Sequence, residues 1–270
     1  MAIITISRGS YSKGKEVAEK VAARLDFDCI SREVILEASD HFDIPEIKLE
    51  RAIHDAPSIL DHFTHGKRTY IAYVQSALTS RATKDNLVYH GLAGHLLLKG
   101  IPHVLKVRVI AELRDRITAE MQRESMSEKE ARALLLRDDQ ERRKWTKDLY
   151  GVDPWDSSLY DLVVRIHKLT VDDAVELICR AVTRDQFKTS KEGRRRLQDL
   201  AIACQVKAAL VNDYFDVGVT SEYGNVLVYT KAGDRLAHKL EERARHLAGE
   251  IQGINNLEMR TDIPFPPNAV

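Results

Sequence analysis

Two glycines and a lysine near the start of the chain have the spacing of a phosphate-binding loop. Gly9 is followed by four residues and then by Gly14 and Lys15, and Glu16 stands where this motif has Ser or Thr. Glycines let successive backbone N–H groups converge on phosphate oxygens, and the positive end of the following helix adds to the attraction. A lysine here neutralises charge on the β- and γ-phosphates during transfer. We expect nucleotide phosphates to bind the loop of Gly9, Ser10, Tyr11, Ser12, Lys13, Gly14, Lys15 and Glu16.

Glu16 is the departure from the strict motif. A carboxylate at this place can hold Mg²⁺, directly or through water, although it lacks the geometry of a hydroxyl. We therefore predict Glu16 as the metal-binding residue. The alternative is a Gly- and Ser-rich turn whose lysine is solvated, because chance matches to so loose a pattern are common.

A second group of cations lies between Arg132 and Gly151, a segment that we interpret as a helix or lid and call the lid below. Arginines that surround a phosphoryl group stabilise the charge of its transition state, and the candidates here are Arg137, Arg142 and Arg143. These residues do not share one helical face, so their convergence requires a bend or a loop. The alternative is a solvated charged helix, in which the local partners are Asp138, Asp139 and Glu141.

Strands and helices alternate around these residues. Short apolar segments predict strands at residues 2–7, 27–30, 86–91, 103–110 and 160–166. Amphipathic segments predict helices at residues 14–25, 31–39, 111–124, 127–148 and 171–182. Residues 43–83 are mostly helical in pattern, with a polar break at residues 65–67. This alternation indicates the α/β class, a parallel sheet flanked by helices.

Composition limits the kinds of protein that this chain can be. Its 270 residues include 41 Lys+Arg and 41 Asp+Glu, which gives a formal net charge of zero. No nucleic-acid partner is expected from a chain without excess positive charge. The three cysteines form no CxxC pair and indicate reduced thiols. No segment approaches the ~18–20 apolar residues of a transmembrane span, and the start lacks a signal-peptide pattern, which predicts a cytoplasmic protein.

The order of these pieces resembles the cytidylate-kinase-like branch of the P-loop nucleoside monophosphate kinases. Residues 1–182 carry the resemblance, above all Ile6-Ser7-Arg8 leading into residues 12–16 and the stretch from Arg137 to Val163. Glu16 is a feature that the chain shares with this branch. The resemblance implies a P-loop kinase fold in which ATP and Mg²⁺ phosphorylate a (d)CMP-like monophosphate. It assigns catalysis to Lys15, Arg137, Arg142 and Arg143.

The expected acceptor side departs from the family pattern. In cytidylate kinases the third strand leads into an acidic–Gly–Arg–Asp segment, whereas this chain has His90-Gly91-Leu92-Ala93-Gly94-His95. Arg32 and Gly91 remain as candidate substrate-binding residues, and the identity of the acceptor stays open. The alternative function is a nucleotide-binding regulatory or sensor protein with a degenerate acceptor site and a C-terminal interaction domain.

The remaining polar residues have weaker interpretations. His90 and His95 have no metal-ligand spacing and read as surface or strand-end histidines. The aspartates after the lid have two alternatives, which are to hold magnesium or to hold the lid arginines; they are Asp153, Asp156 and Asp161.

The pattern changes after residue 183, the predicted end of the first domain. Residues 184–196 read as a basic linker, with Lys188, Lys191, Arg194, Arg195 and Arg196. Beyond it we expect a small α+β domain over residues 197–262, with a helix from about residue 196. Its segments at residues 206–210, 217–220, 224–228 and 251–257 resemble those of BON domains. The resemblance implies a non-catalytic domain, and the alternatives for its partner are a protein, a small ligand or a lipid surface.

Overall fold

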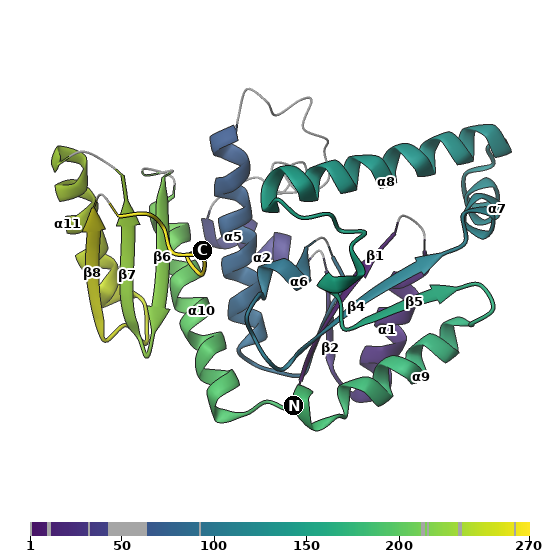
Figure 1. Cartoon of the computed structure of the whole chain (residues 1–270), viewed down its shortest axis with the longest axis horizontal. Coiled ribbons are helices and arrows are strands. Elements are labelled where there is room, and N and C mark those ends of the chain that lie inside the picture. Colours follow the sequence, from purple (N-terminus) through teal and green to yellow (C-terminus); the bar gives the residue numbers. More distant parts are fainter. Residues whose placement is uncertain are drawn as a thin grey trace. The chain divides into compact units, whose positions relative to one another are not determined.

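The computed structural model describes residues 2–9, 12–31, 33–42, 64–91, 93–211, 214, 216–231, 234–261 and 263–270. These residues form two compact units (Figure 1). Described residues 2–33 and 84–189 belong to the first unit, and residues 34–42, 64–83 and 190–270 to the second.

A parallel sheet of five strands is the centre of the first unit, as the alternating pattern predicted. Its strands lie in the order β2-β3-β1-β4-β5, with bounds β1 (Ile3–Arg8), β2 (Asp28–Ile30), β3 (Leu87–Tyr89), β4 (Val104–Ala111) and β5 (Leu162–Ile166). The chain crosses from β3, on one side of β1, to β4, on the other. The carboxyl end of β1 is therefore a topological switch point, the place where open α/β sheets bind ligands.

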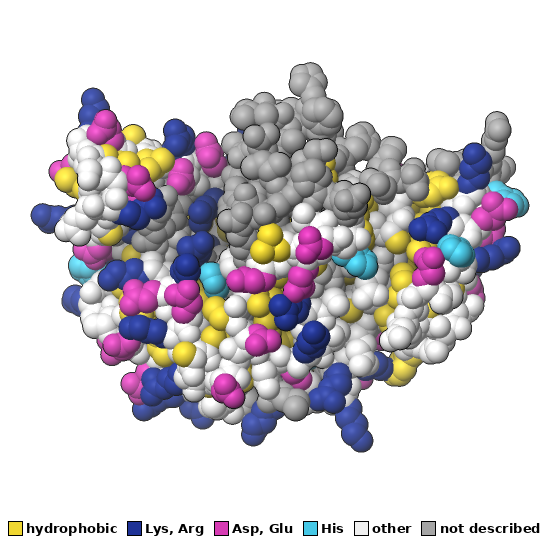
Figure 2. All heavy atoms as spheres, turned by 180° about the vertical axis from the view of Figure 1, so that it is seen from behind, with side chains coloured by type: hydrophobic (Ala, Val, Ile, Leu, Met, Phe, Trp, Pro, Cys, Tyr) yellow, Lys and Arg dark blue, Asp and Glu magenta, His cyan; other side chains and the backbone are white. Residues whose placement is uncertain are grey.

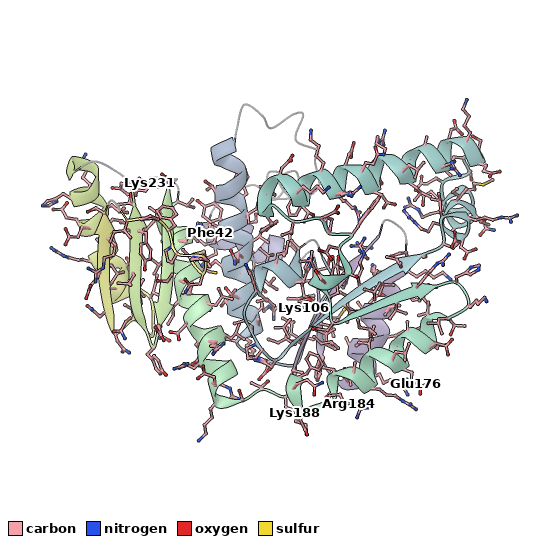
Figure 3. All side chains as sticks on the ribbon, in the orientation of Figure 1. Phe42, Lys106, Glu176, Arg184, Lys188 and Lys231 are labelled. Atoms are coloured by element: carbon pink, nitrogen blue, oxygen red, sulfur yellow. The ribbon has the colours of Figure 1, made fainter. Side chains whose placement is uncertain are left out.

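The two faces of this sheet differ in chemistry. Helices α1 (Gly14–Leu25) and α9 (Val171–Val182) pack on the apolar face, where Val17, Val107 and Ile178 belong to one buried cluster. The opposite face carries Ser7, Lys106 and Arg108, whose positions alternate with those apolar residues. Helix α6 (Gly94–Leu97) and residues 154–160 contact this polar face, and Figure 3 labels Lys106 on β4.

Helices α7 (Leu113–Glu124) and α8 (Glu128–Tyr150) form a hairpin with its own small core. A reciprocal capping box begins α8: Glu130 N donates to Ser127 Oγ at 3.4 Å, and Ser127 N donates to the Glu130 carboxylate at 2.9 Å. The helix ends at Gly151, where φ is 67°. No bend interrupts α8, so Arg137, Arg142 and Arg143 lie on one continuous helix.

The second unit combines helices from two distant parts of the chain with a three-stranded sheet. The strands lie in the order β6-β7-β8, with β6 antiparallel and β8 parallel to β7. Its elements are α2 (Glu33–Phe42), α5 (Thr64–Ala82), α10 (Lys191–Leu210), β6 (Val217–Glu222), β7 (Asn225–Thr230), α11 (Asp234–Glu250) and β8 (Asn256–Thr261). Helix α10 packs against both α5 and β6.

Two expected boundaries are wrong. Helix α5 runs through residues 65–67, where a break was predicted, and α10 begins at Lys191 instead of residue 196. Ser190 caps α10 by accepting from Gly193 N at 2.9 Å, and Glu192 pairs with Arg195 and Arg196 one turn on. These pairs stabilise a helix in a segment whose charge suggests a linker. The domain boundaries at residues 183 and 197 stay predictions.

Charged side chains of both signs are interspersed on the face shown in Figure 2, in keeping with the zero net charge. The cysteines are unpaired, and burial raises the pKa of Cys204 to about 12. Within the described ranges, no helix is long and apolar enough to cross a membrane.

The close approach of α6 to β3 yields a stability test. A Cβ on Gly94 would lie 2.7 Å from Tyr89 Cε1 and 3.3 Å from Thr5 Cβ. Because Tyr89 and Thr5 are both buried, we expect Gly94→Ala to lower the free energy of unfolding by roughly 1–3 kcal/mol, measured by denaturant titration.

Gly249→Ala is the matched control. Gly249 lies in the last turn of α11 with nothing within 4 Å of an added Cβ, so the alanine should not destabilise the fold and should add at most about 0.5 kcal/mol. Equal stability of the Gly94 variant and the wild type would contradict the packing described for α6.

Candidate active site

The loop after β1 is tied to the neighbouring strand. Gly9 N donates to the carbonyl of Val109 at 3.2 Å, and the buried hydroxyl of Ser12 donates to the same carbonyl at 2.9 Å. Ser12 N also donates to Gly9 O at 3.3 Å, which closes the turn. Ser10 and Tyr11 lie outside the described residues. The described part of the predicted loop is thus fixed at the carboxyl edge of β1 and β4.

The start of α1 has the features of an anion site. Lys13 adopts φ 61°, and its side chain makes no capping hydrogen bond. Among the described residues, the first N–H groups of the helix are therefore available to a ligand. A Cβ on Gly14 would lie 2.6 Å from Arg8 Cβ. Glycine is therefore required at residue 14 by the side chain of Arg8, as well as by the motif.

Lys15 and Glu16 point along the outer surface of α1. Lys15 Nζ lies 3.7 Å from the Glu19 carboxylate, and Glu16 lies 3.3 Å from Lys20 Nζ. Exposed pairs of this kind contribute only about 0.3–0.5 kcal/mol, so a phosphate can replace Glu19 as the partner of Lys15. In the described part of the chain, no three His, Cys, Asp or Glu side chains could hold a metal ion together. A Mg²⁺ ion here would depend on nucleotide phosphates and one carboxylate, a usual arrangement for Mg²⁺.

The predicted lid arginines are brought together only in part. Arg137 is two-thirds exposed, 3.9 Å from Glu141. Arg143 donates from Nε to both oxygens of Asp153 at 3.0 Å and lies 4.2 Å over the ring of Trp155. Asp153 therefore holds a lid arginine, one of the two roles expected for it.

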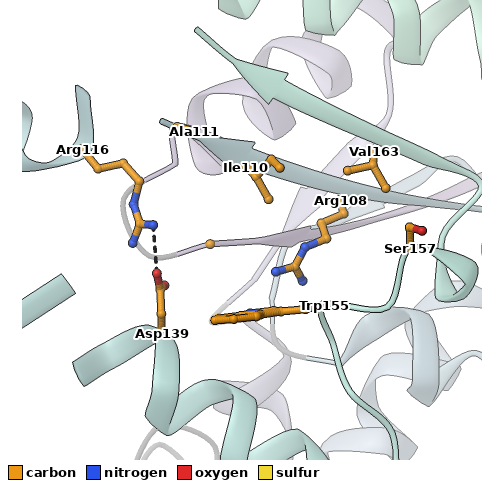
Figure 4. Close-up of a pocket in the computed structure, with 9 residues that line it drawn as sticks. Arg108, Ile110, Ala111, Arg116, Asp139, Trp155, Ser157 and Val163 are labelled. Carbon is orange, nitrogen blue, oxygen red and sulfur yellow. Dashed lines mark ion pairs between the residues drawn. The ribbon is translucent and has the colours of Figure 1, made fainter. Parts of the chain in front are cut away.

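Arginines from four elements line two adjoining cavities. The smaller, about 30 Å³, is lined by Arg8, Arg108, Arg142 and Arg143, and the larger, about 270 Å³, by Arg108 and Arg116. Both cavities reach Gly9 of the loop, and Asp139, paired with Arg116 at 2.8 Å, is their only described carboxylate (Figure 4). We call the two cavities together the arginine hollow. Its net positive charge suits a phosphorylated ligand.

Arg108 is a central residue of the hollow that sequence reasoning missed. Its Nη1 donates to Pro154 O at 2.6 Å and to the Tyr160 hydroxyl at 3.2 Å. A signal was present in the sequence, because Lys106 and Arg108 alternate with valines in a strand of a parallel sheet. Both faces of such strands are usually apolar.

His95 is not a surface histidine. Its side chain is buried, it packs against Tyr160 with the two rings tilted and their centroids 4.7 Å apart, and it lines the smaller cavity. Neither ring nitrogen has a hydrogen-bond partner among the described residues. Burial lowers the pKa of His95 to about 4, and Arg108 and Lys106 act in the same direction. His95 is therefore a neutral imidazole at neutral pH.

The two predicted substrate residues have different outcomes. Arg32 lies outside the described residues. Gly91 follows β3, where a Cβ would lie 2.5 Å from Tyr89 Cζ, so packing against the tyrosine ring explains this glycine without a ligand. His90, beside it at the strand end, is buried, and burial lowers its pKa to about 4.

The buried histidine gives a pH prediction. Below pH 6.5 the unfolded chain protonates His95, whereas the folded chain does so only near pH 4. Stability should therefore fall as the pH drops through this window, by up to about 3 kcal/mol from this group. Urea unfolding of His95→Gln should show a shallower fall than the wild type. Parallel pH profiles would mean that the imidazole titrates normally in the fold.

Comparison with known proteins places this geometry in a family. Residues 3–168 match the cytidylate kinase-like family. A cytidylate kinase of Methanosarcina acetivorans is 32% identical over 102 residues, which are 37% of this chain and 56% of the relative, so the match spans about half of that protein. An uncharacterized protein of Eubacterium ventriosum, 20% identical, aligns with a TM-score of 0.53 over 68% of this chain and 100% of its own. The last likeness concerns the fold alone.

The family match covers the phosphate loop, the polar face of the sheet, the α7–α8 hairpin and all five arginines of the hollow. A kinase fold, a loop with open helical N–H groups and a cationic hollow beside it belong together chemically. The chain is a member of the cytidylate kinase-like family.

Proposed function

We propose that this protein is an ATP-dependent nucleoside monophosphate kinase whose acceptor is a (d)CMP-like nucleotide. The observation that carries the proposal is the arginine hollow that adjoins Gly9. A kinase must hold two anionic groups in contact, and positive charge beside a phosphate loop offsets their repulsion. The cytidylate kinase among the relatives supports cytidine as the nucleoside.

The proposed reaction moves the γ-phosphoryl group of ATP to a phosphate oxygen of the acceptor. The bond to the β–γ bridging oxygen breaks as the new P–O bond forms, and ADP leaves. The acceptor oxygen is already anionic, so positioning and charge neutralisation are the chief requirements. Lys15 exchanges Glu19 for the β- and γ-phosphates, and Arg142 and Arg143 contact the transferred group. Glu16 would hold Mg²⁺ together with the phosphates, and the ion would supply further charge neutralisation when bound.

A second candidate is a nucleotide sensor in the cytoplasm. It is favoured by the absent Arg and Asp after β3 and by the second unit, which lies largely beyond the family match. In this version the BON-like segment transmits nucleotide binding to a protein, a small ligand or a lipid surface. Calorimetry separates the candidates, because ATP binding without any monophosphate binding favours the sensor.

A panel of nucleoside monophosphates tests the proposed reaction. We expect ADP formation from ATP and Mg²⁺ to be fastest with CMP or dCMP, measured by a coupled assay. The absence of turnover with every common monophosphate, in protein whose melting transition is cooperative, would reject the kinase.

Lys15→Ala tests the phosphate site. Loss of one charge-stabilising donor should lower kcat by about a hundredfold or more with the fold intact. Arg24→Ala is the matched control: Arg24 lies in the last turn of the same helix, away from the loop, and its loss should leave kcat within about twofold. Equal rates for the two variants would show that this loop does not bind the transferred phosphate.

A further inference from the structure

The two edges of the three-stranded sheet in the second unit differ. The order β6-β7-β8 places β6 at one edge and β8 at the other. Residues that follow β8 close the β6 edge: Val270 N donates to Val219 O at 3.0 Å, and Val219 N donates to Val270 O at 3.4 Å. Phe265 lies against the same strand, because a Cβ on Gly218 would be 3.1 Å from its ring. The chain itself therefore pairs and covers the β6 edge.

The β8 edge has no such cover in the part of the chain that the structure describes. The described backbone hydrogen bonds of β8 run to β7 and to the turn at Gly224, and Figure 1 shows β8 as the outermost strand of this sheet. Its six residues pair with β7 without interruption and include no proline, so neither a bulge nor a proline protects the edge. Open N–H and C=O groups on such a strand are a template for another strand.

The side chains of β8 alternate between the two faces of the sheet. Leu257 and Met259 pack against the buried cluster of the second unit, so Glu258 and Arg260 lie on the opposite face. Both charged side chains are about half exposed, and Arg260 Nη2 lies 2.9 Å from the Glu258 carboxylate. Charges of one sign along an edge repel a second strand of the same sequence. Here two opposite charges are two residues apart, a spacing that favours the pairing of β8 with itself.

We propose that β8 pairs antiparallel with β8 of a second copy of this chain, about a two-fold axis that passes beside Met259. In this register Glu258 lies opposite the partner's Arg260, and symmetry repeats the pair on the other side of the axis. Met259 lies opposite its own counterpart on the face that carries the buried cluster, and Leu257 lies opposite Thr261. The two three-stranded sheets become one sheet of six strands.

The charges of β8 select this register among the antiparallel alternatives. An axis beside residue 258 places the two Glu258 side chains opposite each other, and an axis beside residue 260 does the same to the two Arg260 side chains. Like charges directly opposite are destabilising. A slip of one residue joins the apolar face of one sheet to the polar face of the other.

Main-chain hydrogen bonds supply the affinity of such an interface, and the cross-strand charges supply its register. Six residues from each copy form a small interface, so we expect a weak dimer whose population rises with protein concentration. The inference does not depend on the proposed kinase, because no nucleotide takes part in the association.

Charge reversal tests the pairing. Sedimentation velocity at increasing concentrations should show the wild type passing from monomer to dimer. Glu258→Arg places arginine opposite arginine at two symmetric positions of the dimer, and Arg260→Glu places glutamate opposite glutamate. Each variant alone should lower the association constant by about tenfold or more. Loss of the exposed pair within one strand should leave the fold intact.

Two combinations of these substitutions restore the attraction. The doubly reversed chain, with Glu258→Arg and Arg260→Glu together, exchanges the charges and should dimerise as the wild type does. An equimolar mixture of the two single variants should form a heterodimer, because every cross-strand contact then joins arginine to glutamate. Glu222→Arg is the control: this exposed residue ends β6, the opposite edge strand, and its reversal should not change the association.

Three results would overturn the inference. They are a wild type that stays monomeric at its highest soluble concentration, a dimer that persists in both single variants, and single variants that fail to associate when mixed. Thermal melting by circular dichroism separates lost association from lost folding. If a reversal impairs folding, Glu258→Gln supplies the test: it removes both cross-strand attractions, so the association should weaken severalfold and become less sensitive to salt. Unchanged association of that variant would also reject the β8 pairing.

Discussion

The pairing of β1 with β4 is the constraint on which the site depends. Their parallel register runs from Ile3 beside Val104 to Arg8 beside Val109. The phosphate loop and the arginine of β4 therefore reach the same edge of the sheet. A slip of this register by one residue would turn Arg108 toward the apolar face that α1 covers. The buried cluster on that face thus fixes the position of a charged residue on the other.

Five guanidinium groups in one hollow repel one another, and the fold offsets this repulsion locally. Arg143 is held by Asp153, Arg116 by Asp139, and Arg108 by a carbonyl and a hydroxyl. The Arg143 guanidinium keeps the pKa of Asp153 well below its ordinary range, so this carboxylate stays charged near neutral pH. Positive charge is thus fixed in place within the hollow, which would reduce the reorganisation that the proposed binding and transfer require.

Much of the fold was predictable from local pattern. The periodicities of residues 14–25 and 171–182 predict α1 and α9 with the bounds that the structure has. The loop of residues 9–16 could be proposed from the sequence because phosphate binding needs a fixed spacing within one segment, and its role stays a prediction. The hollow was not, since Arg8, Arg108 and His95 come from separate elements that only the strand order brings together.

The local sequence pattern was a poor guide to charged segments that form helices. The cations of residues 191–196 suggest a solvated linker, yet Glu192 pairs with two of them at helical spacing. The prediction grouped Arg137 with Arg143 because both are arginines. They lie on one unbroken helix, where Arg137 faces solvent beside Glu141 and Arg143 lines the smaller cavity. The number and type of charged residues in a segment do not show which side of the helix each of them faces.

The packing of α5 against α10 restricts which sequences the two helices can have. Helix α5 lies within the family-matched segment and α10 beyond it, yet both belong to the second unit, where Thr79 and Cys204 are hydrogen-bonded and buried. A chain that stopped at residue 183 would leave the apolar side of α5 uncovered. Helix α5 of the family-matched segment and helix α10 beyond it therefore pack against each other within the second unit, and each constrains which sequences the other can accept.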